Sequence, residues 1–177
     1  MLVSDAIAEI LKREGVEFIV GYPVNPIIEA AARADIRTII VRQERTGIHM
    51  ADAFSRINSG DEIGVFVMQH GPGSENAFGG VAQAYGDSVP IIIIPAGYDR
   101  KLTNVTPNFS SLLNFQHVAK SVEQVTVSSA IPDAMRRAFS AVRNGRPRPA
   151  VIEIPTDVFP EEIESLSYTA VKVARSA

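Results

Sequence analysis

Short apolar runs alternate with segments of helical periodicity along most of the chain. The apolar runs are rich in Ile and Val and are bounded by Gly, Pro or Asn, which is typical of buried strands. They predict strands at residues 18–20, 38–41, 63–68, 91–95, 122–127 and 150–154. Between them, apolar residues recur at helical spacing and predict helices at residues 4–14, 25–34, 44–57, 71–85 and 132–143.

Strands that alternate with helices, and that are apolar without interruption, indicate a parallel sheet with both faces covered. We therefore predict an α/β fold with a flavodoxin-like, doubly wound, mostly parallel sheet and helices on both faces. Ser4 and Asn25 are suited to cap the first two helices, and Gly15 is suited to end the first. Residues 99–116 are rich in Asn, Thr and Ser, and we predict them to be irregular.

Length and composition fit one globular domain followed by a short extension. The 177 residues are 46% apolar and 21% charged. Periodicity is lost after residue 158, so we predict a domain at residues 1–160 and a linker or tail at residues 161–177. The net charge is −3 and the basic residues are scattered, which argues against a nucleic-acid partner.

The residue types that the chain lacks exclude several kinds of site. The chain has no cysteine, so no disulfide framework or thiolate metal site is expected, and its three histidines have no metal-ligand spacing. Charged residues interrupt residues 1–17, which fit neither a signal peptide nor a membrane span. We expect a cytoplasmic protein with no membrane partner and no metal site of its own.

Three predicted strand-to-helix loops carry unusual residues, and all should emerge at the carboxyl edge of the sheet. They are Gly21-Tyr22-Pro23, the helix start at Glu44, and residues 69–76 with the sequence Gln-His-Gly-Pro-Gly-Ser-Glu-Asn. The third loop is not a dinucleotide fingerprint, because Asn76 stands where a small residue is required. Taken alone, Glu44 is also explained as an acid that interacts with a helix dipole.

Five stretches in this order resemble the N-terminal, pyrimidine-binding domain of thiamine diphosphate enzymes of the acetohydroxyacid synthase and 2-keto acid decarboxylase type. The resemblance covers about residues 1–160. The five stretches are Gly21-Tyr22-Pro23, residues 42–56 beginning Arg-Gln-Glu, residues 71–76 with Gly-Pro-Gly-Ser-Glu-Asn, residues 84–91 with Ala-Tyr-Gly-Asp-Ser-Val-Pro-Ile, and residues 145–158 beginning Gly-Arg-Pro-Arg-Pro.

The resemblance implies a role for Glu44 in thiamine diphosphate chemistry. The matching glutamate hydrogen-bonds N1′ of the aminopyrimidine and favours its imino tautomer, which takes the C2 proton of the thiazolium and gives the ylide that attacks a 2-keto acid. A carboxyl group in an apolar, closed site suits this role, because it can share a proton with a ring nitrogen. The implied residues beside the pyrimidine are Tyr22, Pro72, Gly73 and Asn76, and those on the substrate side are Pro23, Val24 and His70.

Two motifs of the family are missing. The Gly-Asp-Gly and Asn-Asn residues that hold Mg²⁺ and the diphosphate do not occur, so another domain must supply them. The resemblance therefore implies a partner, a site at a chain interface in a homodimer or larger homo-oligomer, and no activity of this chain alone. The expected partner is a diphosphate-binding domain, either in the same longer chain or in a separate subunit.

Three interpretations stay open at this point. The chain is an N-terminal fragment of a longer acetolactate synthase-like lyase or transferase, a natural split alpha subunit of a two-subunit 2-keto acid decarboxylase, or a non-catalytic flavodoxin-like binding module. Two departures from the family bear on the choice. Phe109 is followed by Ser110 and Ser111 where the synthases carry Phe-Gln-Glu, and residues 99–116 lack the paired histidines of pyruvate decarboxylases.

Overall fold

The computed structural model describes residues 1–173 and contains one six-stranded sheet in which every neighbouring pair is parallel. The order across the sheet is β2-β1-β3-β4-β6-β5. The strands are β1 (Phe18–Gly21), β2 (Arg37–Ile40), β3 (Gly64–Met68), β4 (Ile91–Gly97), β5 (Ser121–Gln124) and β6 (Ala150–Pro155). The predicted doubly wound α/β fold is confirmed, and the sheet is parallel throughout.

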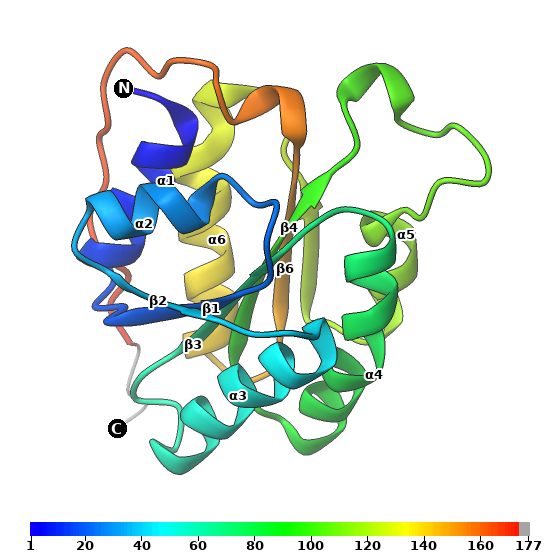
Figure 1. The fold of residues 1–177 in the computed structure, drawn as a ribbon. Coiled ribbons are helices and arrows are strands. Elements are labelled where there is room, and N and C mark those ends of the chain that lie inside the picture. Colours follow the sequence, from blue (N-terminus) through cyan, green and yellow to red (C-terminus); the bar gives the residue numbers. More distant parts are fainter. Residues whose placement is uncertain (174–177) are drawn as a thin grey trace.

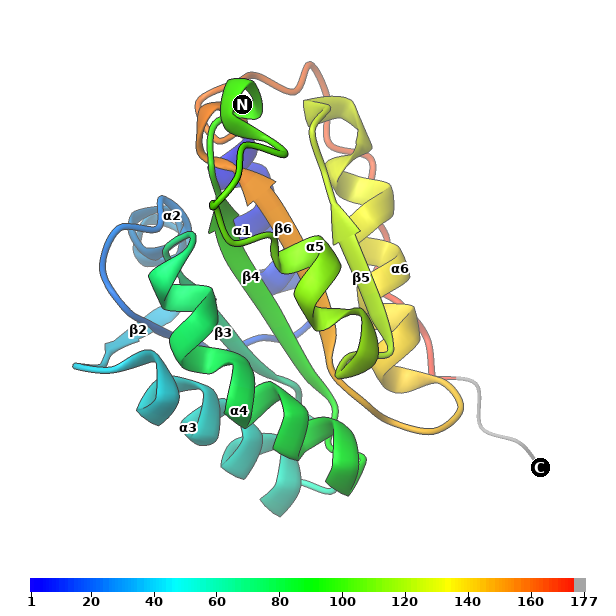
Figure 2. The same ribbon diagram turned by 90° about the vertical axis from the view of Figure 1, so that its right-hand side faces the viewer.

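Helices cover both faces of this sheet (Figures 1 and 2). One face carries α1 (Val3–Arg13), α2 (Ile27–Arg33) and α6 (Ile131–Arg143); the other carries α3 (Glu44–Ile57), α4 (Pro72–Asp87) and the short α5 (Ser111–Asn114). The chain crosses to one face after β1 and to the other after β2 and β3, which places a topological switch point between β1 and β3.

The side-chain alternation of the central strands divides the core into two layers. In β3, Val65 and Val67 pack with the α1, α2 and α6 layer, whereas Phe66 and Met68 pack with the α3 and α4 layer. The four isoleucines of β4 alternate in the same way. Because a strand buried on both faces has apolar residues at every position, this explains why the strands read as uninterrupted apolar runs.

Several predicted boundaries shift in the structure. Ser4 does not cap α1, because the helix begins one residue before it and the N-cap position falls on Leu2. Asn25 does cap α2, since its Oδ1 accepts a hydrogen bond from the amide of Ile27 at 3.0 Å. Gly15 adopts φ 81° just after α1, as expected of a glycine that ends a helix.

The segment at residues 99–116, predicted to be irregular, contains short helical pieces. Three-residue 3₁₀ turns lie at residues 100–102 and 115–117, and α5 lies between them. The hydroxyl of Ser110 caps α5 by accepting from the amide of Leu113 at 3.3 Å. A helix this short has too little apolar periodicity to be seen in the sequence.

Within the described residues no helix or strand follows residue 158, yet the first half of the predicted linker or tail is packed against the domain. Ile163 and Tyr168 are buried, and Glu162 forms an isolated antiparallel bridge with Leu2. Ile163 and Tyr168 therefore belong to the packed core layer of α1, α2 and α6. Residues 174–177 lie outside the described part of the chain. Within the described part, no helix is long and apolar enough to cross a membrane.

Candidate active site

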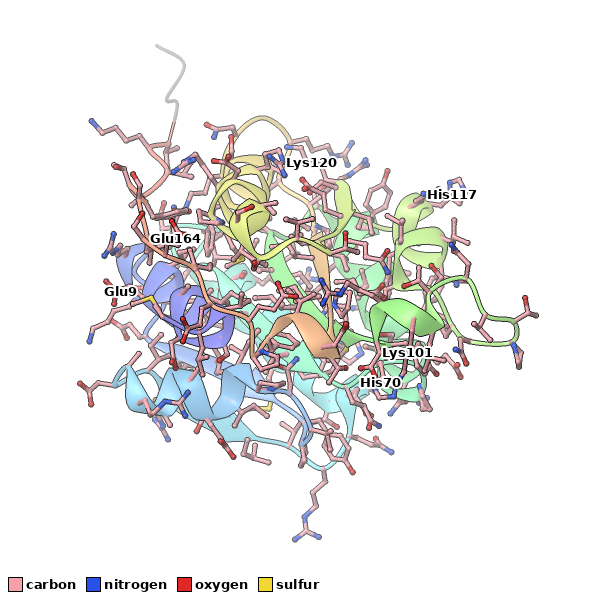
Figure 3. All side chains as sticks on the ribbon, turned by 90° about the horizontal axis from the view of Figure 1, so that it is seen from above. Glu9, His70, Lys101, His117, Lys120 and Glu164 are labelled. Carbon is pink, nitrogen blue, oxygen red and sulfur yellow. The ribbon has the colours of Figure 1, made fainter. Side chains whose placement is uncertain are left out.

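The three loops singled out in the sequence meet at the carboxyl edge of the sheet, around the switch point between β1 and β3. Figure 3 looks down on this edge, where His70 lies, whereas His117 points away at the periphery. In open α/β sheets this is where ligands bind. The three loops singled out in the sequence therefore lie together at one edge of the sheet.

Glu44 is the first residue of α3 and is only 5% exposed. The side-chain amide of Asn76 in α4 donates to its Oε2 at 2.6 Å. Among the described residues, Oε1 receives no hydrogen bond and no basic side chain lies within 4 Å of the carboxylate. The helix start contributes partial positive charge, but one carboxylate oxygen is left available for a donor from outside the chain.

The glycines of the third loop are required by close packing. A Cβ on Gly73 would lie 3.2 Å from Oε1 of Glu44 and 2.8 Å from Cγ of Gln69. Gly71 adopts φ 54° at the start of α4, and a Cβ there would lie 2.3 Å from the hydroxyl of Tyr98. The sequence interpretation gave Gly73 a role in close approach to a ligand; the structure adds that Gly73 makes room for Glu44 itself.

The loop after β1 is held rigidly by Asn25. Its buried amide donates to the carbonyls of Met68 at 2.9 Å and Ile94 at 3.0 Å, so it joins this loop to the end of β3 and the middle of β4. Val24, just before it, has φ 71° and is 71% exposed. A β-branched residue with positive φ is strained, and such strain is found where the surrounding structure fixes the backbone at functional sites.

The residues assigned to the substrate side line a single pocket. Pro23, Val24 and His70 share an open cavity of about 490 Å³ with Ile40 and Thr156, among others. The ring of His70 packs against that of Tyr98, with centroids 4.4 Å apart. Tyr22, by contrast, is half-buried and packs against the α3 and α4 core layer. Pro72 is exposed at the first position of α4.

Sequence reasoning missed several polar residues at this edge. Glu153 in β6 is buried and accepts hydrogen bonds from Gln124 and from the amide of Ser111. An acid inside the apolar run Val-Ile-Glu-Ile was a visible signal, because an unpaired charge in a buried strand is costly. Tyr98, directly after β4, had no signal beyond its place at a strand end.

The structure fits half of a thiamine diphosphate site. The free oxygen of Glu44, beside Asn76 and Gly73, suits a ring nitrogen that carries or shares a proton. The residues that the structure describes contain no group of three or more His, Asp or Glu side chains able to hold a metal ion.

The chain is similar to known proteins over most of its length. The model of a family described as "Thiamine pyrophosphate enzyme, N-terminal TPP binding domain" matches residues 1–130. A probable acetolactate synthase large subunit from Methanocaldococcus jannaschii is 35% identical over 170 residues, which cover 93% of this chain and 28% of that protein. An acetolactate synthase from Arthrospira platensis is 33% identical over 96% of this chain and 31% of its own length.

The acetolactate synthase large subunit of Haemophilus influenzae shows the same relation, with 31% identity over 93% of this chain and 31% of that protein. The chain thus spans less than a third of the length of these curated relatives. The matched region includes the Glu44, Gly71 and Asn76 positions, since all three fall within residues 1–130.

Proposed function

The chain belongs to the family of N-terminal thiamine pyrophosphate-binding domains of thiamine pyrophosphate enzymes, and from this premise we propose that it is the pyrimidine-binding half of a lyase or transferase acting on 2-keto acids. The supporting observation is the buried carboxylate of Glu44, which has one oxygen held by Asn76 and the other free at the switch point. Bound there, thiamine diphosphate would supply the carbanion chemistry.

The residues of this chain bind and orient the pyrimidine. Glu44 holds a proton at the ring nitrogen, and Asn76 fixes the direction of the carboxylate at 2.6 Å. Gly73 and Pro72 keep the start of α4 close to that carboxylate, and Tyr22 flanks the ring from the loop after β1. Pro23, Val24 and His70 line the neighbouring cavity and form part of the wall on the substrate side.

In this proposal a second domain completes the site, since the described residues contain no group of three or more His, Asp or Glu side chains that could hold a metal ion. The relatives are more than three times as long as the matched region, which favours an N-terminal fragment of a longer, acetolactate synthase-like enzyme. In that arrangement Mg²⁺ and the diphosphate are held by a domain outside this chain, and the working form is a homo-oligomer with the site at an interface. A natural split alpha subunit is the alternative that shares this chemistry.

The test uses the complete enzyme, whether it is one longer chain or two subunits. We expect the 177-residue chain alone to give no turnover of a 2-keto acid. In the complete enzyme, Glu44→Gln should lower kcat by roughly 100-fold or more, because it removes a proton-transferring group. Glu75→Gln is the matched control, since Glu75 is an exposed glutamate in the first turn of the neighbouring α4.

Retention of full activity by Glu44→Gln would overturn the proposal and favour a non-catalytic binding module. Reading the gene beyond codon 177 separates the remaining alternatives. An open frame that continues into a Gly-Asp-Gly domain identifies a fragment, whereas a stop codon followed by a separate gene with that motif identifies a split subunit.

A further inference from the structure

A second pocket lies under the segment that joins β4 to β5, on the same edge of the sheet but nearer to β6. Figures 1 and 2 show this segment projecting from the carboxyl edge and returning through α5. The pocket has a volume of about 220 Å³ and shares no lining residue with the cavity next to His70. Nothing in the proposed thiamine chemistry uses it.

Glu153 lines this pocket and is only 4% exposed. The amide of Ser111 donates to its Oε2 at 3.1 Å, and the side chain of Gln124 donates to its Oε1 at 2.5 Å. Both donors are neutral, and within the described part of the chain no basic side chain lies within 4 Å. Burial of a charge without a cation is costly, so the pocket has an uncompensated negative charge at its wall.

The fold makes space specifically for this carboxylate. A Cβ on Gly97, the last residue of β4, would lie 3.1 Å from Cγ and 3.3 Å from Cδ of Glu153. A carboxylate has about four lone-pair directions, and only two are used by Ser111 and Gln124. Each oxygen of Glu153 therefore keeps capacity for one further donor.

The rest of the lining defines the ligand. It contains no Lys, Arg or His, and its apolar part includes Leu102, Phe109 and Leu113. We propose that this pocket binds a small organic cation, a primary ammonium group with a short apolar tail, whose nitrogen donates to Glu153. A 2-keto acid has the opposite charge and would be repelled by the same carboxylate, so this ligand differs from the substrate of the proposed reaction.

Two buried hydrogen bonds lead from this pocket to the first turn of α4. Ser111, which donates to Glu153, also contacts the hydroxyl of Ser74 at 3.2 Å. Ser74 lies in the first turn of α4, two residues before the Asn76 that holds Glu44. Because Glu153, Ser111 and Ser74 are buried, we expect an ammonium ion at Glu153 to shift the signals of this first turn, including Asn76, without touching Asn76 itself.

The direct test is a titration of the 177-residue chain, followed by the ¹H–¹⁵N signals of the Gln124 and Asn76 side-chain amides. The probe is n-butylammonium, and butyrate is the anionic counterpart of similar size. We expect saturable shifts with n-butylammonium and at least tenfold weaker binding of butyrate, since a hydrogen bond to a charged group is worth about 1.5 kcal/mol or more.

Two variants make the test independent of folding defects. Glu153→Gln should weaken n-butylammonium binding at least tenfold; Leu113→Trp should do so by filling the pocket mouth, because Leu113 is 62% exposed and leaves the contacts of Glu153 intact. Glu164→Gln, an exposed glutamate outside the lining, is the control.

Equal affinity for n-butylammonium and butyrate, or no saturable shift with either, would overturn the proposal. The same holds if a folded Leu113→Trp variant binds as tightly as the parent chain. These outcomes are separate from the thiamine proposal, because the titration measures neither turnover nor the effect of Glu44.

Discussion

Two buried glutamates at helix ends have opposite surroundings. Glu14 ends α1 and is 7% exposed, and its carboxylate contacts the guanidinium of Arg143, the hydroxyl of Tyr168 and the amide of Val171. Glu44 begins α3 and is buried to the same degree, but its one partner among the described residues is the neutral amide of Asn76.

The difference separates an acid whose oxygens are satisfied within the fold from an acid that keeps one oxygen without a donor. A buried carboxylate that is matched by an arginine and filled with donors has no capacity for a ligand, and its loss leaves a buried cation. A buried carboxylate with an empty oxygen at the sheet edge gains a partner only when something binds. Glu153 belongs with Glu44 in this respect, since its two donors are also neutral.

The largest effect should come from Glu14. Glu14→Gln removes the countercharge of Arg143, whose side chain is only 12% exposed, so we expect a loss of roughly 3 kcal/mol in the free energy of unfolding. Urea denaturation followed by circular dichroism measures this. Glu9→Gln, which breaks the exposed Glu9–Arg13 pair, is the control and should cost less than about 0.5 kcal/mol. Equal losses for both would remove the contrast.

A smaller effect should come from the other partner of Glu14. Burial, and then the hydrogen bond to Glu14, raise the pKa of Tyr168 well above its ordinary value. The folded state therefore keeps the Tyr168 proton at a pH where the unfolded chain has lost it. The contribution of Tyr168 to the free energy of unfolding is complete below about pH 10 and declines as the pH rises further.

Tyr168→Phe should cost roughly 1 kcal/mol at neutral pH through loss of that hydrogen bond. It should also flatten the decline in stability above about pH 10. Unfolding free energies measured from pH 8 to pH 11 for both proteins test this. An equal decline of the unfolding free energy in the parent chain and the variant would show that the Tyr168 proton does not stabilise the folded state.

The smallest effect on stability should come from Glu44. Glu44→Gln keeps an acceptor for Asn76, removes a buried charge and loses the helix-dipole interaction, which is worth about 0.3–1 kcal/mol. We expect a change within about 1 kcal/mol in either direction, which equilibrium unfolding will measure. A loss as large as that of Glu14→Gln would place Glu44 with Glu14 among the acids that are satisfied within the fold and weaken the proposed site.

Apolar periodicity was enough to predict the fold because each central strand is buried on both faces. Ile91 to Ile94 read as a strand in any context, and the alternation with helices then leaves a parallel sheet as the simplest arrangement. Helix ends were less predictable. Ser4 has the chemistry of a cap but lies inside α1 and is buried, because packing of Leu2 beside residue 162 starts the helix earlier.

The candidate site was likewise predictable in part. The sequence marked Glu44, the Gly71 to Gly73 loop and Asn76, since their residue types and order carry a family resemblance. It could not pair Asn76 with Glu44 across 32 positions, or show that Asn25 joins the loop after β1 to two other strands. Those contacts depend on how three crossovers bring separate loops together.

The sequence by itself determined the α/β architecture and the edge of the sheet at which the three loops gather, because these follow from periodicity and strand direction. Only the tertiary structure decided which buried carboxylates have all their hydrogen-bond and charge partners within the chain. Glu14 receives its arginine from position 143, whereas Glu44 and Glu153 receive only neutral donors and keep capacity for a further one. Long-range packing sets the number of partners, and no local pattern encodes it.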